Sequence, residues 1–325
     1  MVETYGLPGV EGLRLRANGV ELHAAAAGPP DGPLVMLLHG FPEFWYGWRR
    51  QIGPLAAAGL RVVAPDGRGY NLSDKPPGTA AYALDTLADD VLGLARALGR
   101  DRFAVVGHDW GAVVAWHLAG RNPDRVERAA VLNGPHPATV RPFMRAHPSQ
   151  ALRSWYAAFF QAPLLPEWTL GAADFAWLRA SLARSARPGA FSDEDLRRYR
   201  DSWARPGALS AMLNWYRALA RHGPPPRPPQ RIRAPVRVVW GDRDPFLDRG
   251  LVEAGLALCD RGEAFHLPGA THWVQHEEPE RVNRLLIEFL TAAPAVDRPG
   301  ALPPSPARQQ VRGPVEAPQR RPEPD

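Results

Sequence analysis

Five short apolar runs separated by segments with helical periodicity constrain the fold of this chain more than any other feature. They read LVMLLH at 34–39, RVVAPD at 61–66, FAVVGH at 103–108, RAAVLN at 128–133 and PVRVVWG at 235–241. Continuous apolar strands of this kind are typical of a parallel sheet that is covered by helices on both faces. Residues 84–99 place leucine, valine and alanine at helical spacing and end at a glycine, as a crossover helix does. The sequence therefore predicts an α/β fold with a mostly parallel sheet.

The alternation stops in the middle of the chain and again at its end. Residues 137–230 are rich in aromatic side chains, helical in pattern, and end in the proline-rich stretch GPPPRPPQ. We expect an inserted helical cap there, between two parts of the α/β core at 1–136 and 231–292. Residues 293–325 are rich in proline and arginine and poor in large apolar residues. A disordered tail is predicted for that segment.

Composition excludes several classes of protein. The single cysteine, Cys259, excludes an intrachain disulfide and offers no spacing for a metal site. No apolar run approaches the length of a membrane span, and the first residues do not resemble a secretion signal, so we expect a cytoplasmic protein without membrane insertion. The net charge of +5 comes almost entirely from arginines spread along the chain, which argues against nucleic acid as a partner. Nothing in the sequence indicates an oligomeric state.

The pentapeptide GHDWG at 107–111 lies between an apolar run and a helical segment. In a strand, sharp turn and helix of this kind, the central residue of G-x-S-x-G is an exposed nucleophile. Here Asp109 stands in place of the serine. A serine that attacked a saturated carbon would form a stable ether, whereas a carboxylate forms an ester that water can hydrolyse. Asp109 is therefore predicted to be a nucleophile toward saturated carbon.

Hydrolysis of such an ester requires a base that activates water and an acid that orients the base. His272 lies between the β-type run 263–267 and the last helical segment, and Asp244 follows the run 235–241. The resulting order of nucleophile, acid and histidine predicts Asp244 and His272 as the acid and the base. Asp242 is the alternative acid. We expect His276 to be exposed on a helix, and a further histidine, at 108, to pack beside the turn.

Attack of water on the ester builds negative charge on a carboxyl oxygen, which requires hydrogen-bond donors. The sequence HGFPEFWYGWR at 39–49 follows the run 34–39 and contains a glycine turn. We expect the backbone N–H groups of Phe41 and Trp110 to be the two donors. The alternative interpretation of HGFP is a tight turn alone.

At this point the chain resembles the epoxide hydrolases of the α/β-hydrolase fold, over about residues 10–290. The motifs that carry the resemblance are HGFPEFWYGWR, APDGRGYNLSDKP at 64–76, GHDWG, GDRDPFL at 241–247 and GATHWVQHEEPE at 269–280. The resemblance implies two cap tyrosines that hold the epoxide oxygen. SWYAAFFQ at 154–161 points to Tyr156, and LNWYRAL at 213–219 points to Tyr216.

The resemblance also implies conversion of an apolar epoxide to a vicinal diol, with no metal and no organic cofactor. A phenol suits this reaction because it donates a hydrogen bond to the developing alkoxide without carrying a charge itself. We expect an apolar, aromatic pocket that includes Phe41, Trp110, Phe159 and Trp215. The sequence does not identify the epoxide, the carbon attacked or the preferred enantiomer.

Two other functions stay open. A haloalkane or haloacid dehalogenase would use the same Asp, His and Asp groups, and Trp110 follows the nucleophile as in haloalkane dehalogenases. Phe41, however, stands where those enzymes carry a polar residue, and fluoroacetate-type enzymes would have arginine at 110. A hydrolase fold that only binds ligands or signals would have lost one of its catalytic groups, and all of them are present.

Overall fold

The computed structural model describes residues 4–223 and 231–293. Its described residues form an eight-stranded sheet in the order β1-β2-β4-β3-β5-β6-β7-β8. β2 runs antiparallel to β1 and β4, and the remaining neighbours pair in parallel. The strands are β1 (Glu11–Ala17), β2 (Val20–Ala27), β3 (Leu34–Leu38), β4 (Arg61–Pro65), β5 (Phe103–His108), β6 (Val126–Leu132), β7 (Val236–Gly241) and β8 (Gly262–Leu267).

The α/β fold class is confirmed, and β3 to β7 coincide with the five apolar runs. These strands are almost entirely buried, as a parallel sheet covered on both faces requires. The sequence interpretation missed the hairpin of β1 and β2. Its turn is Asn18-Gly19, both with positive φ, at 47° and 80°, and Asn-Gly is a strong hairpin signal.

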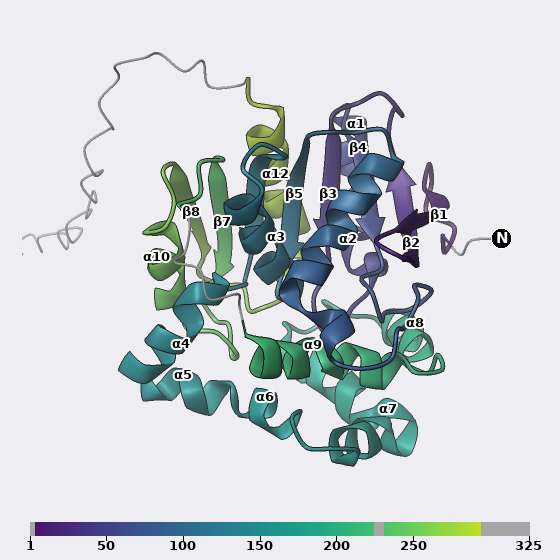
Figure 1. Cartoon of the computed structure of the whole chain (residues 1–325), viewed down its shortest axis with the longest axis vertical. Coiled ribbons are helices and arrows are strands. Elements are labelled where there is room, and N and C mark those ends of the chain that lie inside the picture. The colour runs from purple at the N-terminus through teal and green to yellow at the C-terminus, as the bar shows by residue number, and fades with distance from the viewer. Residues whose placement is uncertain (1–3, 224–230, 294–325) are drawn as a thin grey trace, which may run out of the picture. The chain divides into compact units, whose positions relative to one another are not determined.

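Helices cover both faces of the sheet. Figure 1 shows α2 and α3 in front of the strands and α1 and α12 behind them. The helices that precede residue 137 or follow residue 231 are α1 (Ile52–Ala57), α2 (Leu84–Ala97), α3 (Trp110–Arg121), α10 (Gly250–Leu256), α11 (Val274–Glu277) and α12 (Pro279–Thr291). Short 3-10 helices lie at Trp45–Trp48 and Ala80–Tyr82.

All the regular secondary structure of residues 137–223 is helical. They form α4 (Pro137–Ala146), α5 (Pro148–Arg153), α6 (Trp155–Phe159), α7 (Leu165–Ser185), α8 (Asp193–Trp203) and α9 (Ala208–His222). Figure 1 places these helices below the sheet, toward the carboxyl ends of its strands. They and the sheet belong to one compact unit that ends at Thr291. We call 137–223 the cap; the linker 224–230 and the predicted tail beyond Ala293 lie outside the described residues.

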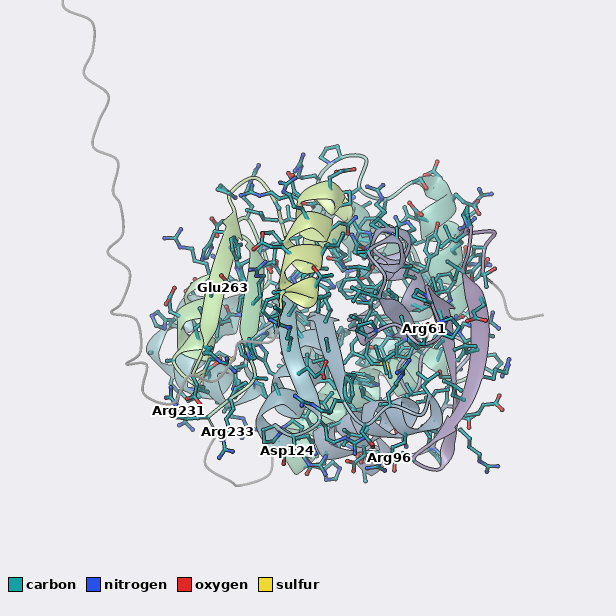
Figure 2. The ribbon with its side chains drawn as sticks, turned by 90° about the horizontal axis from the view of Figure 1, so that it is seen from above. Arg61, Arg96, Asp124, Arg231, Arg233 and Glu263 are labelled. Atoms are coloured by element: carbon teal, nitrogen blue, oxygen red, sulfur yellow. The ribbon has the colours of Figure 1, made fainter. Side chains whose placement is uncertain are left out.

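Ionisable side chains lie at the opposite edge of the sheet, at the amino ends of strands. Arg61 begins β4, Asp124 precedes β6 and Arg233 precedes β7, and all three are labelled in the view from above (Figure 2). Arg61 forms an ion pair with Glu11 of β1. The carboxyl ends of the strands lie toward the cap. In α/β sheets, ligands bind at that edge.

Candidate active site

The turn between β5 and α3 positions Asp109. Its backbone has φ 52° and ψ −116°, a conformation that a residue with a Cβ adopts only under strain. Asp109 is the residue before α3, so its carboxylate stands next to the positive end of the helix dipole. The strand, turn and helix predicted from GHDWG are therefore present, and they place the carboxylate at the carboxyl edge of the sheet.

Glycines allow the chain to approach itself closely around this turn. A Cβ on Gly111 would lie 1.9 Å from the carbonyl oxygen of Leu38, and a Cβ on Gly40 would lie 2.4 Å from the Cβ of Asp109. Such contacts are far inside van der Waals range, so only glycine fits at either position. The close approach brings the loop after β3 against the carboxylate.

That loop supplies a backbone donor to the carboxylate of Asp109. The N–H of Phe41 donates to Oδ1 of Asp109 at 2.8 Å. Trp110 is the first residue of α3, where backbone N–H groups have no partner within the helix. The Phe41 N–H therefore contacts the carboxylate directly, and the Trp110 N–H belongs to the residue that follows Asp109 in the chain.

His272 connects Asp109 to Asp244. The Nε2 atom of His272 lies 3.7 Å from Oδ2 of Asp109, and its Nδ1 lies 2.7 Å from Oδ2 of Asp244. Because an ionised Asp244 can only accept, Nδ1 carries the proton, and Nε2 presents its lone pair toward Asp109. The structure therefore brings together the three residues predicted as nucleophile, base and acid.

Asp244 is held in the ionised form. Its Oδ1 accepts hydrogen bonds from the N–H groups of Phe246 and Leu247, and the Asn133 amide donates to Oδ2 at 2.7 Å. Burial alone raises the pKa of Asp244, but His272 and these donors outweigh it and lower the pKa below 3.8. Sequence reasoning missed Asn133; its only signal was an asparagine at the end of an apolar run.

The carboxylate of Asp244 in turn raises the pKa of His272. Burial alone lowers the pKa of His272, but the charge and hydrogen bond of Asp244, with the charge of Asp109, raise it above 6.5. Asp242, the alternative acid, pairs instead with Nδ1 of His266 at 2.6 Å. The geometry therefore favours Asp244 over Asp242 as the partner of His272.

The two cap tyrosines line the same cavity as Asp109. Tyr156 in α6 and Tyr216 in α9 have ring centroids 6.1 Å apart, and Tyr216 packs edge-on against Phe41 and Trp110. Burial, followed by the charge of Asp109, raises the pKa of both phenols above 10.0. Both phenols are therefore neutral donors at neutral pH.

One cavity of about 480 Å³ connects these groups. Asp109, His272, Tyr156, Tyr216 and Phe41 all line it, together with Pro42, Leu152, Arg153, Trp155, Phe160, Trp177, Leu178, Ser181, Leu182, Pro245, Phe246 and Trp273. The lining is largely apolar and aromatic, with a few convergent polar groups, as in small-molecule sites.

Two predicted pocket residues do not line this cavity. The Trp215 indole lies outside the cavity lining and donates to the Arg68 carbonyl oxygen at 2.9 Å. Phe159 packs against Trp155 and Phe160, and Phe160 takes its place in the cavity wall. The helical periodicity was right, but it could not tell which face of each helix meets the cavity. The Trp110 side chain is also absent from the lining and is 6% exposed.

Beneath the cavity, the buried carboxylate of Glu43 joins the core to the cap. Its Oε1 accepts from the Tyr199 hydroxyl of α8 at 2.6 Å and lies 2.7 Å from Nε2 of His276. Its Oε2 lies 3.2 Å from Nδ1 of His108 and accepts from Gln275 at 3.1 Å. Burial alone raises the pKa of Glu43, but His276 and His108 lower it well below 4.5.

This cluster corrects one prediction and extends another. His276 is buried at 1% exposure, not exposed, because its ring binds Glu43. Burial lowers the pKa of His276 to about 4. His108 packs beside the turn as expected, and its Nε2 lies 2.9 Å from the backbone oxygen of His272. Glu43 itself was missed, although it stands in the motif HGFPE.

Comparison with known proteins identifies the family. A family model described as alpha/beta hydrolase fold matches residues 33–279. Epoxide hydrolase 3 of Xenopus tropicalis is 36% identical over 284 residues, covering 86% of this chain and 77% of the relative. The chain belongs to the epoxide hydrolases of the α/β-hydrolase fold.

One further relative in sequence and one solved structure are also similar to this chain. The AB hydrolase superfamily protein YfhM of Bacillus subtilis (strain 168) is 47% identical, covering 87% of this chain and 99% of the relative. The crystal structure of a Bacillus megaterium epoxide hydrolase in complex with an inhibitor superposes with a TM-score of 0.79 at 31% identity. It covers 86% of this chain and 100% of that one.

The described residues hold neither a candidate metal site nor a candidate membrane span. In 4–223 and 231–293, no three His, Cys, Asp or Glu side chains are grouped so that they could hold a metal ion. Over the same ranges, none of the helices has the length and apolar character required to span a bilayer.

Proposed function

We propose that this chain adds water to an apolar epoxide and releases a vicinal diol through a covalent ester on Asp109. The observation that carries the proposal is the single cavity in which a carboxylate and a histidine face two neutral phenols. Relatives that bear the name epoxide hydrolase support the reaction class.

The first half-reaction uses the two sides of the cavity together. Oδ2 of Asp109 attacks one ring carbon, and the C–O bond to the epoxide oxygen breaks. Tyr156 and Tyr216 donate to that oxygen as it becomes an alkoxide, and one of the phenols supplies the proton that makes it a hydroxyl. Phe41, which already donates to Oδ1, leaves Oδ2 as the oxygen free to attack.

The second half-reaction hydrolyses the ester. Nε2 of His272 takes a proton from water, and the hydroxide attacks the carboxyl carbon of Asp109. The N–H groups of Phe41 and Trp110 stabilise the charge on Oδ1, and Asp244 stabilises the imidazolium. When this intermediate collapses, the C–O bond to the substrate breaks and the proton of the new carboxyl group passes to the departing alkoxide, which releases the diol. The proton on His272 returns through solvent to the tyrosinate left by the first half-reaction, so the phenol is restored.

A dehalogenase remains the alternative because it would use the same three residues. A departing halide requires N–H donors facing the cavity, and the Trp110 indole is not among the lining residues. Trp155, Trp177 and Trp273 do line the cavity, so halide release is the appropriate second readout.

The deciding experiment is a paired assay of the wild type and Tyr216→Phe. A terminal aryl epoxide is scored for diol and a bromoalkane for released halide. Diol formation that falls sharply in the variant, with negligible halide release from either protein, supports the proposal. Halide release that does not depend on Tyr216 would assign the chain to the dehalogenases instead.

A further inference from the structure

A second hollow opens beside the catalytic cavity. It has a volume of about 560 Å³, and it shares Trp177, Ser181, Pro245 and Phe246 with that cavity. Its other lining residues come from the end of α7, the loop that follows it, the loop after β7 that carries Arg243, and the turn after β8. An extended molecule bound at Asp109 can therefore continue into this hollow, which we call the arginine groove, along a wall of Trp177 and Phe246.

The arginine groove is basic. Arg184, Arg187 and Arg243 line it, and no acidic residue does. Arg187 is partly neutralised by Glu278, and Glu277 accepts from its backbone N–H. Arg184 and Arg243 are exposed, and neither guanidinium has an ion pair or hydrogen bond with any residue in the described ranges.

The distribution of charge in the cap agrees with this local excess. Residues 137–223 contain twelve arginines and six acidic residues. On α8, Arg197, Arg198 and Arg200 pair with acids. The arginine groove is different because its free guanidinium groups adjoin the wall of the catalytic cavity.

We propose that the arginine groove binds the carboxylate of the substrate, so that the preferred epoxides carry an anionic end on an apolar chain. This inference rests on the proposed epoxide hydrolysis. The chain would follow the aromatic wall from Asp109, and the carboxylate would meet the forks of Arg184 and Arg243. Guanidinium matches a carboxylate in charge and in planar geometry, and such charge-assisted pairs are stronger than neutral hydrogen bonds.

The test compares epoxides that differ only at the far end of a saturated chain. A long-chain terminal epoxide with a carboxylate, its methyl ester and a short-chain carboxylate analogue are each assayed for diol. The wild type should favour the long acid over its ester by about tenfold in kcat/KM, mainly through KM. Rising salt should erode this preference, because the groove is exposed. The short acid should show no preference, since its carboxylate does not reach the groove.

Variants then assign the preference to the two arginines. Arg184→Ala/Arg243→Ala should remove the preference for the acid, and Arg184→Glu/Arg243→Glu should reverse it. Arg145→Ala is the matched control, because Arg145 is an exposed cap arginine that lines neither hollow. A preference that survives the double alanine variant, or that the wild type lacks at every chain length, would overturn the proposal.

A binding measurement separates this inference from the proposed reaction. Calorimetric titration with a long-chain alkyl carboxylate that lacks the epoxide reports on the groove without turnover. Binding that is weakened by the double variant but not by Arg145→Ala supports the groove even if no epoxide is opened, in which case the proposed reaction fails. Equal binding by all three proteins would reject the groove even if epoxides are hydrolysed.

Discussion

The core side and the cap side of the catalytic cavity are held in place by different forces. On the core side, hydrogen bonds fix Asp109, His272 and Asp244, and glycines hold the backbone at a close approach. On the cap side, Tyr156 and Tyr216 are positioned by edge-on contacts with other aromatic rings. Directional bonds fix the geometry of bond making, whereas aromatic packing tolerates changes in the shape of the ligand.

The difference separates chemistry from selectivity. Replacing a core-side group should stop a particular half-reaction, and replacing a cap-side group should slow the reaction by degrees.

The largest expected effect is on the core side, where His272→Gln should abolish turnover. Without its base the ester forms but is not hydrolysed, so the rate of diol release should fall by about ten thousandfold. Intact-mass spectrometry after epoxide addition should show one substrate adduct on the protein. The matched control is Asp109→Ala, which should form no adduct. Absence of an adduct in His272→Gln, under conditions where the wild type turns over, would count against the covalent scheme.

On the cap side the loss should be graded. Tyr216→Phe or Tyr156→Phe alone should lower kcat by about 10²- to 10³-fold, as loss of one oxyanion donor does. The double variant should lose far more, because no phenol then remains to protonate the alkoxide.

Tyr70→Phe is the control for the phenols. Tyr70 is buried at 1% exposure, does not line the cavity, and its hydroxyl lacks a hydrogen-bond partner in the described part of the chain. Its removal should leave kcat within about twofold of the wild type. Equal losses in Tyr70→Phe and Tyr216→Phe would mean that the phenols act through packing alone.

The acid limb of the pH profile tests the link between Asp244 and His272. His272 acts as a base only when neutral, and Asp244 raises its pKa above 6.5. The single-turnover rate of ester hydrolysis should therefore decline, as pH falls, from a point above pH 6.5. In Asp244→Asn the raising charge is gone, so the limb should move to lower pH while the maximal rate falls. An unmoved limb would show that another group controls it.

The link between core and cap at Glu43 should affect stability more than chemistry. Tyr199→Phe removes a hydrogen bond to a buried, ionised carboxylate, so it should lower the free energy of unfolding by about 1–3 kcal/mol. Denaturant titration of the purified variant measures this loss. Tyr46→Phe should cost less, because its hydroxyl donates to the less deeply buried Asp195 and accepts from the partly exposed Arg198. The reverse order would show that Glu43 is not the stronger junction.

Acid should weaken the fold through histidines that are buried in the neutral form. Burial lowers the pKa of both His276 and His136 to about 4. The unfolded chain binds these protons near pH 6.5, so stability should fall as pH decreases from about 6.5 to about 4, by up to about 1.4 kcal/mol per pH unit for each histidine. His136→Asn should make this pH dependence shallower. An unchanged slope in urea titrations at several pH values would contradict this account.

The sequence predicted the core side of the site better than the cap side. Asp109 and Asp244 follow apolar strands, and His272 follows the β-type run 263–267. Parallel strands bring their carboxyl ends to one edge, so position in the sequence determined position in space. Asn133 and Glu43 were missed because their roles depend on partners far away in the chain. Phe159 and Trp215 were placed wrongly because a helix surrounded by aromatic residues does not show which face meets the cavity.

The contacts that a Cβ at Gly40 or Gly111 would make have a consequence for altering the enzyme by directed evolution. Substitution of either glycine should yield proteins that cannot form the turn that carries Asp109, so libraries randomised there should contain few active variants. Saturation of the cap positions Leu152, Trp155 and Trp177, which line the cavity and are already partly open to solvent, reshapes the entrance without disturbing that turn. Mutational tolerance is thus concentrated on one wall of the cavity, and new substrate ranges are reached by changing that wall.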